Sequence, residues 1–442
     1  MIRQLNRLTV LISAGFLLVA LTTGYWVIVR GGDLLQRGDN PRRALVERRV
    51  PRGVIYDRNG LVLADSAGQP GAWTRHYPYP DLAPVLGYVS PLVGSAGIEA
   101  ALDPTLHGDG GLDPFSIYWR TTLLGVPPPG RGVRLTIDLN LQRVADTALS
   151  AHTGAVLLLD AQAGEVLVLA SHPTFNANAL DDHWSEVVND PASPLLNRAT
   201  LALYQPGGAI EPVIVAGALA NGLATPAQTF VGADQPVAVD GQRLACRAQT
   251  PGSNLALGSA LALGCPAPAA ALGQSLGAAG LTRLFTQFQF FAAPALAIPA
   301  AASSADQVSV FTDTALAGIG QAGLTVTPLQ MALVTAALVR GGQMPSPQLV
   351  LQTQNADGGW SGVPPLAPQP PVIAPAVADQ VKSMLPTGLQ AIALTSTGGK
   401  SLAWYLGLNP YDKPRYVVVV LLEDGTPRAA KDIGDALLVA AR

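Results

Sequence analysis

The sequence predicts an α+β protein that is attached to a membrane by one N-terminal helix. Three observations lead to this prediction. Residues 8–29 form one uncharged, mostly apolar run, and short apolar strands occur in pairs at 154–171 and 403–422. Helical patterns occur beside them, at 142–149 and 429–441. Apolar strand pairs with helices beside them predict a mainly antiparallel sheet flanked by helices.

The apolar run at residues 8–29 lies between Arg7 and Arg30. As a helix it would extend about 33 Å, which is enough to cross the hydrocarbon core of a bilayer. Tyr25 and Trp26 near its end fit an interfacial aromatic belt. A cleavable signal peptide is the alternative, but the run is long for one and no A-x-A site follows it. A retained anchor is therefore predicted.

Composition narrows the function classes. The chain has 442 residues, enough for two to three domains, with 49% hydrophobic and 13% charged residues. A formal net charge of −3 gives no sign of nucleic-acid binding. The two cysteines, Cys246 and Cys265, and the five histidines show no metal-ligand spacing, and no cofactor motif is predicted. The cysteines could form one disulfide in an oxidising compartment, or be two small buried hydrophobic residues.

The orientation of the anchor is ambiguous from charge alone. Two arginines precede the apolar run, whereas Arg30, Arg37, Arg42, Arg43, Arg48 and Arg49 lie at its end or beyond it. The positive-inside rule, applied locally, would place the large domain in the cytoplasm. Long domains can cross despite such charge, and the Arg-rich stretch is predicted to be a solvated stalk near the membrane.

The segment after the stalk begins with a hairpin. Residues 51–64 read PRGVIYDRNGLVLA, in which Asp57-Arg58-Asn59-Gly60 forms a tight turn between short strands. Further on come Gly97-Ile98-Glu99 and Leu106-His107-Gly108. Residues 125–132, GVPPPGRG, are rich in proline and glycine and predict a domain boundary at about residue 134.

The larger part of the chain follows this boundary. It opens with LTIDLNLQ at 135–142, and continues with the strands GAVLLLD at 154–160 and EVLVLAS at 165–171. Residues 324–332, LTVTPLQMA, place Pro328 in the first turn of a helix. Residues 193–212 read SPLLNRATLALYQPGGAIEP, which has the layout of a helix start that carries a nucleophile.

Taken in order, these segments resemble the motifs of class B penicillin-binding proteins. The resemblance implies a cytoplasmic tail at 1–7, a transmembrane anchor at 8–30, a stalk and small dimerisation-like pedestal at 31–134, and a serine transpeptidase/β-lactamase-like domain at 135–442. It also implies a bacterial cytoplasmic membrane protein with one membrane pass and an extracytoplasmic large domain. Its expected partners are the membrane, peptidoglycan peptides and other proteins of cell-wall synthesis or division.

The chemistry of that family needs three motifs, as the resemblance implies. A serine attacks the substrate carbonyl, a lysine three residues later accepts its proton, and Ser-x-Asn and Lys-Thr/Ser-Gly segments orient the substrate. This chain contains only Lys382, Lys400, Lys413 and Lys431, and none of them completes S-x-x-K, K-T-G or K-S-G. No S-x-N occurs either.

By the same resemblance, the motif positions hold residues that cannot perform these steps. The nucleophile and lysine positions are Gly208 and Glu211. The Ser-x-Asn positions correspond to Gly264 and Pro266, and the Lys-Thr-Gly positions to Leu394, Thr395 and Ser396. Loss of the nucleophile alone removes the covalent route. The sequence therefore predicts a transpeptidase-like pseudoenzyme that acts through protein partners or ligand binding.

Other interpretations remain at this point. Residual D,D-peptidase, transpeptidase or penicillin-binding activity could come from groups that the motifs do not reveal. Glu211 could also act as a general base on a water in the space beside Gly208, which would give a hydrolase without an acyl-enzyme. In the simpler interpretation, Glu211 is a carboxylate favoured by the dipole of the first helical turn. The chain could also bind muropeptides noncovalently as a sensor.

Overall fold

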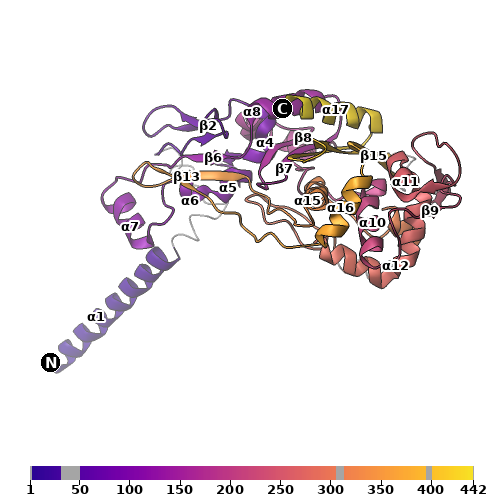
Figure 1. The fold of residues 1–442 in the computed structure, drawn as a ribbon. Helices are drawn as coiled ribbons and strands as arrows, with labels where there is room; N and C mark the ends of the chain where they lie inside the picture. The colour runs from indigo at the N-terminus through magenta and orange to yellow at the C-terminus, as the bar shows by residue number, and fades with distance from the viewer. Residues whose placement is uncertain (1, 31–49, 305–312, 395–400, 442) are drawn as a thin grey trace.

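A computed structural model describes residues 2–30, 50–304, 313–394 and 401–441. The helix α1 (Ile2–Gly24) continues into the π-helical turn η1 (Tyr25–Val29). Figure 1 shows α1 as a rod that extends away from the globular part. Residues 6–24 are the one segment within the described ranges that is long and apolar enough to cross a membrane. The predicted stalk at 31–49 lies outside the described residues.

The globular part next to α1 is built on a six-stranded sheet of order β14-β13-β6-β1-β2-β3. Its strands are β1 (Ile55–Tyr56), β2 (Val62–Ala67), β3 (Thr74–His76), β6 (Val133–Leu135), β13 (Val350–Gln354) and β14 (Trp360–Gly362). The predicted hairpin is confirmed as β1–β2. The Asp57 carboxylate holds its turn by accepting from the backbone N–H groups of Asn59 and Leu61 at 2.8 Å.

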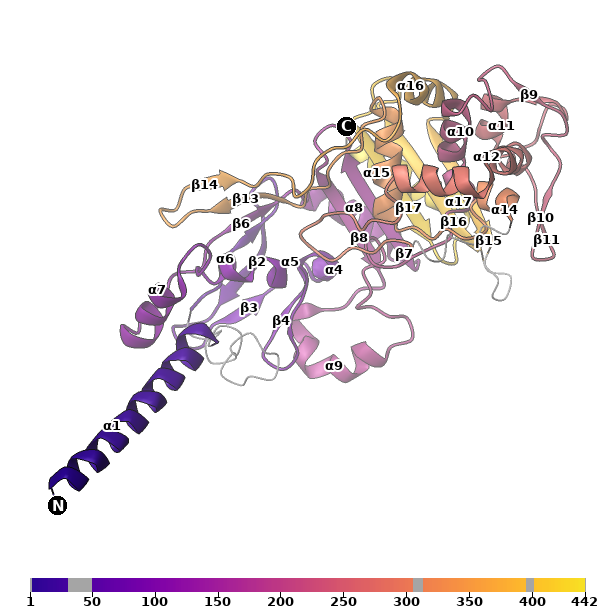
Figure 2. The ribbon, with the colours of Figure 1, turned by 90° about the horizontal axis from the view of Figure 1, so that it is seen from below.

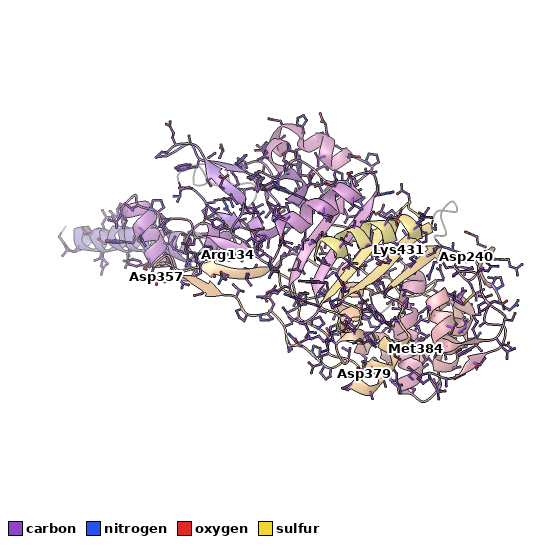
Figure 3. The ribbon with its side chains drawn as sticks, turned by 45° about the horizontal axis from the view of Figure 1, so that its top comes forward. Arg134, Asp240, Asp357, Asp379, Met384 and Lys431 are labelled. Carbon is purple, nitrogen blue, oxygen red and sulfur yellow. A yellow bond between two sulfur atoms is a disulfide. The ribbon has the colours of Figure 1, made fainter. Side chains whose placement is uncertain are left out.

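Two of these six strands come from a distant part of the chain. β13 pairs antiparallel with β6, and Val350 lies opposite Leu135. Figure 3 shows Arg134 of β6 and Asp357 of the β13–β14 turn at the same end of the molecule, the end nearer to α1. The division at residue 134 stays a prediction, and the sequence did not predict that residues 350–362 reach across it.

Short helices and one hairpin complete this first part. They are η2 (Pro80–Leu82), α4 (Ala83–Leu86), β4 (Val89–Ser90), β5 (Gly94–Ser95), α5 (Gly97–Ala101), α6 (Asp103–Leu106), α7 (Pro114–Tyr118) and η3 (Trp119–Leu123). A buried ion cluster joins them to the sheet. Glu99 accepts from Arg52 Nε at 3.0 Å and from Arg75 Nε at 2.5 Å. Arg52 also contacts Asp103 at 2.7 Å.

The second part contains a five-stranded, fully antiparallel sheet of order β15-β16-β17-β7-β8. Its strands are β7 (Gly154–Asp160), β8 (Val166–His172), β15 (Gly388–Leu394), β16 (Ser401–Asn409) and β17 (Tyr416–Leu422). Alternate residues of β17 face opposite sides: Val418 and Val420 pack in one core cluster, and Val417 and Val419 in the other. Both faces are covered, which explains the continuous apolar runs in the sequence.

Helices cover both faces of this sheet, as predicted. α8 (Leu139–Leu149) and α17 (Pro427–Ala440) pack on one face, and α15 (Pro328–Val339) packs on the other. Figure 2 shows α15 between the sheet and the outer helices. Pro328 occupies the first turn of α15, and Thr327 and Gln330 form a capping box. The prediction for this helix entry is confirmed.

The remaining elements surround α15 or connect the sheet. They are η4 (Ala177–Ala179), α9 (Leu180–Asn189), η5 (Gly207–Ile210), α10 (Glu211–Ala220), β9 (Thr229–Phe230), β10 (Val237–Val239), β11 (Gln242–Leu244), β12 (Leu255–Ala256), α11 (Leu257–Leu263), α12 (Pro266–Gln287), α14 (Thr314–Gly318) and α16 (Pro375–Met384). The β10–β11 hairpin, with Asp240 in its turn, lies at the end of the molecule away from Arg134 (Figure 3).

Candidate active site

The candidate site is the turn that leads from Tyr204 into α10. Gly207 has φ +53°, and a Cβ added to it would lie 2.1 Å from the carbonyl oxygen of Ile392 in β15. Only glycine fits such a conformation and approach. On its other side, Gly207 N–H donates to the carbonyl of Gly320 at 3.1 Å. The turn is therefore pressed between β15 and the segment that precedes α15.

Side chains from several elements hold this turn in place. Glu423, just after β17, accepts from Arg198 Nε at 2.8 Å and from the Tyr204 hydroxyl at 2.7 Å. Trp404 Nε1 in β16 donates to the carbonyl of Gln205 at 3.0 Å. Burial beside Glu423 raises the pKa of Tyr204 well above its usual value. The Asn-Arg and Tyr-x-Pro-Gly frame seen in the sequence is thus a rigid support for the turn.

At the position predicted for the nucleophile, Gly208 offers no reactive side chain. A Cβ at this residue would lie 3.3 Å from Glu211 Oε1 and 3.4 Å from the Ala391 Cβ in β15. The structure thus brings Gly208 and Glu211 together on one side of the helix start, as their i, i+3 spacing requires. The Glu211 carboxyl occupies the neighbourhood in which a nucleophile side chain would stand.

Glu211 is a buried carboxyl at the first turn of α10. Its side chain makes no hydrogen bond or ion pair within 4 Å to any residue that the structure describes, and only 3% of the residue is exposed. Burial raises the pKa of this carboxyl from 4.5 to about 8, against the opposing charge of Arg247. The group is therefore mainly protonated at neutral pH. No described residue orients the carboxyl by a hydrogen bond, although such a contact is typical of a positioned general base.

Arg247 was not singled out by the sequence, and it lies between β15 and α11. Its Nη1 donates to the carbonyl of Gln390 in β15, and its Nη2 donates to the carbonyl of Ala262 in α11 at 3.0 Å. Burial lowers the pKa of this guanidinium. The side chain thus bridges β15 and α11, and its charge acts on the Glu211 carboxyl. No local pattern marks it, because its contacts come from distant segments.

The predicted Ser-x-Asn positions form the link between α11 and α12. Gly264 is left-handed and ends α11, and Pro266 opens α12. A Cβ at Gly264 would lie 2.7 Å from Arg247 Nη1. Between these two residues, Cys265 forms a disulfide with Cys246, with an S–S distance of 2.09 Å. This disulfide fixes the residue next to Arg247, so it holds the arginine close to Gly264.

The predicted Lys-Thr-Gly positions are only partly described. Leu394 is the last residue of β15, and Thr395 and Ser396 lie outside the described residues. The part of β15 that contacts the Gly207–Gly208 turn is Ala391, Ile392 and Ala393. These three side chains are uncharged and apolar. The register predicted for this motif stays a prediction, and packing points to a segment a few residues earlier.

One other group of catalytic residue types occurs in this part of the fold. His172 Nε2 lies 3.2 Å from Asp146 Oδ1, and both side chains are buried. The adjacent Ser171 hydroxyl instead donates to the carbonyl of Leu196 and accepts from the N–H of Arg198. Neighbouring residues on a strand point to opposite faces, so these residues form no Ser-His-Asp triad. No metal-binding group of three or more ligands occurs among the described residues.

Comparison with known proteins settles the family. Residues 154–391, more than half of the chain, match the penicillin-binding protein transpeptidase domain, and residues 52–133 match the penicillin-binding protein A dimerisation domain. The chain belongs to the penicillin-binding protein transpeptidase family. This confirms the resemblance to class B penicillin-binding proteins and the fold class that it implied.

Similar proteins cover nearly the whole chain. The peptidoglycan D,D-transpeptidase PbpA of Mycolicibacterium smegmatis is 28% identical, over 91% of this chain and 91% of that protein. The Mycobacterium tuberculosis protein of the same name is 27% identical, over 99% and 98%. The ceftriaxone acyl-enzyme complex of M. tuberculosis penicillin-binding protein A superposes with a TM-score of 0.79 at 26% identity, over 90% of this chain and 99% of that one.

Proposed function

We propose that this protein is a membrane-anchored, catalytically inactive homologue of the peptidoglycan transpeptidases. It would act in cell-wall synthesis or division through protein partners. The observation that carries this proposal is the turn at Gly208, where the family fold is kept but no nucleophile is present. The relatives named transpeptidases support the link to peptidoglycan, and the absent chemistry supports the non-catalytic role.

Two further features of the site support inactivity. The position of the family's lysine base holds Glu211, a buried carboxyl that no described residue orients by a hydrogen bond. Arg247 joins β15 to α11 through direct hydrogen bonds to both backbones, beside the Gly264 that stands at a Ser-x-Asn position. Together these features argue against residual D,D-peptidase activity.

The proposed location is the outer face of a bacterial cytoplasmic membrane. The helix α1 is long and apolar enough for one pass, and the Arg-rich residues 31–49 follow it. The paired cysteines, Cys246 and Cys265, fit an oxidising compartment better than the cytoplasm. Membership of the penicillin-binding protein family also favours a large domain on the outer face of the membrane. The first helix would then act as a retained signal-anchor.

The decisive test is intact-mass analysis of the full chain in detergent after incubation with penicillin G. A matched control is M. tuberculosis penicillin-binding protein A, for which a penicillin G acyl-enzyme complex has been solved. We expect a one-to-one mass increase for the control and none for this protein. A covalent adduct on this chain would mean that another nucleophile works, and the proposal would be wrong.

A Gly208→Ser variant sharpens the same test. The added Cβ has just enough space beside Ala391, but the new hydroxyl would face Glu211 rather than a lysine. We therefore expect no adduct with this variant either, because a serine without a base is a weak nucleophile. An adduct formed by the variant and not by the wild type would show that only the nucleophile is missing.

A further inference from the structure

A row of exposed apolar side chains lies on the short helix of the pedestal formed by α7 and η3. Phe115, Trp119 and Leu123 are spaced four residues apart, so they lie on one face of this helix. Leu124 and Val126 follow in the sequence, and all five side chains are between 47% and 60% exposed. The Phe115 and Trp119 rings contact each other, with centroids 5.9 Å apart. Exposed apolar rows of this size mark interaction surfaces.

The position of this row identifies what covers it. α7 packs beside η1, the turn that directly continues α1. Figures 1 and 2 both show α7 next to the C-terminal end of α1. The candidate span at 6–24 would rise about 28 Å as a helix, which fills the hydrocarbon core of about 30 Å. The residues Tyr25–Val29 then lie at the depth of the lipid headgroups.

The residue types of η1 and of the α7–η3 helix suit the depth of the lipid headgroups. Tyr25 and Trp26 of η1 are exposed, and Trp119 lies on the neighbouring helix. Tryptophan and tyrosine favour the membrane–water interface, because their rings are apolar with one polar group. Arg120 is exposed on η3 and can reach lipid phosphates. A short helix with an apolar face and a polar face lies in the interface plane.

We propose that the α7–η3 helix inserts its apolar row into the lipid interface and fixes the pedestal against the bilayer. The surface is continuous with α1, so the lipid bilayer is the partner that the structure favours over a soluble protein. The inference rests on the proposed membrane insertion of α1, but not on which side the large domain faces.

The test uses the full chain reconstituted into phosphatidylcholine vesicles, with or without bromine on the acyl carbons nearest the headgroups. Brominated lipid quenches tryptophans that lie in the interface. The chain has six tryptophans, so variants assign the quenched emission. We expect Trp119→Phe to remove a clear share of it, because phenylalanine keeps the apolar contact and removes the fluorophore. Trp184→Phe, on α9, should leave the quenched share unchanged.

The outcomes separate the inference from the anchor on which it rests. Loss of quenched emission in Trp26→Phe but not in Trp119→Phe would show that α1 is inserted and α7 is not, which overturns the inference. The same result is expected if the row docks on another membrane protein, since pure lipid vesicles contain none. If neither variant loses quenched emission, α1 is not inserted either, and the proposed anchor is wrong.

A second measurement tests insertion without fluorescence. Leu123→Glu combined with Leu124→Glu changes two exposed side chains, so the fold should persist. We expect these charges to expel the helix and to raise backbone hydrogen exchange at 114–126 above that of the wild-type protein in the same vesicles. Equal exchange of wild type and variant in vesicles would overturn the inference.

Discussion

Glu211 makes the stability of this protein depend on pH in an unusual direction. The pKa of its carboxyl is about 8 in the folded state and 4.5 as the ordinary value. Between these values the folded state binds more protons than the unfolded state, so the free energy of unfolding falls as pH rises. The total effect is on the order of 5 kcal/mol at most. Most buried ion-paired carboxylates act in the opposite direction.

The corresponding prediction concerns Glu211→Gln. Glutamine has the shape of the protonated carboxyl but cannot ionise. We expect this variant to melt at the same temperature as the wild type at pH 5 and several degrees higher at pH 8.5, as measured by thermal unfolding. Glu186→Gln, on the exposed surface of α9, is the control and should show no such difference. A wild-type protein as stable at pH 8.5 as the Glu211→Gln variant would contradict the buried, raised pKa.

At the level of single residues, the sequence predicted part of the candidate site. Gly208 and Glu211 could be placed because the Asn-Arg and Tyr-x-Pro-Gly residues around them lie close in the chain. Arg247 could not be found, because Gln390 and Ala262 give it its role and one of them is 143 residues away. The packing of β15 against the Gly208 turn likewise required the structure, since no lysine marks the third motif.

Among the elements, the link between β11 and α12 depends on one covalent bond. Cys246 and Cys265 are 19 residues apart and enclose β12 and α11. A disulfide of this loop length stabilises a fold by about 2–4 kcal/mol. It also holds Arg247 beside Gly264. The structure thus assigns the bond a local role in keeping Arg247 between β15 and α11.

We expect Cys246→Ala with Cys265→Ala to lower the melting temperature and to raise hydrogen exchange at 246–264. Mild reduction of the wild type should produce the same two changes. Reduction should have no effect on the double variant, which serves as the matched control. If the variant and the reduced wild type exchange as slowly as the oxidised protein, the disulfide does not hold this segment.

The buried ion cluster of the pedestal gives a second prediction for an element. Glu99, on α5, is the carboxylate shared by Arg52 and Arg75, and all three side chains are almost fully buried. Glu99→Ala would remove the carboxylate of Arg75 and leave Arg52 with Asp103 as its remaining ion-pair partner, in a low-dielectric interior. We expect a loss of about 3–5 kcal/mol in the free energy of unfolding, measured by denaturant titration.

The control for that cluster is Glu186→Ala, which removes an exposed partner of His183. Exposed ion pairs contribute little, so its unfolding transition should match that of the wild type. A Glu99→Ala protein with the same transition as the control would mean that water reaches the two arginines and replaces the carboxylate.

Most elements were predictable because their signals are local. The apolar runs of β7, β8 and β17, the turn of β1–β2 and the proline at the start of α15 each lie within a few residues of the features that define them. Strand pairing was predictable only for neighbours in the sequence. The partnership of β13 with β6 joins segments that are far apart in the chain, and no periodicity reports it.

For the whole molecule, the orientation across the membrane is the property to test. We expect an external protease to digest the large domain in spheroplasts whose membrane is intact. The local excess of arginine after α1 favours a cytoplasmic large domain by the positive-inside rule, whereas family membership favours an external one. The experiment decides between these two orientations. Digestion that requires lysis would place the domain in the cytoplasm. A cytoplasmic protein processed in parallel reports membrane integrity.

The pairing of β13 with β6 also has a consequence for the order in which the protein is made. The pedestal strands emerge from the ribosome early, but their sheet lacks two of its six strands until residue 362 has been synthesised. During that interval β6 is an open edge, which can pair with other extended chains. Such long-range pairing also slows folding. We therefore expect the nascent chain to need a chaperone until residue 362 has emerged.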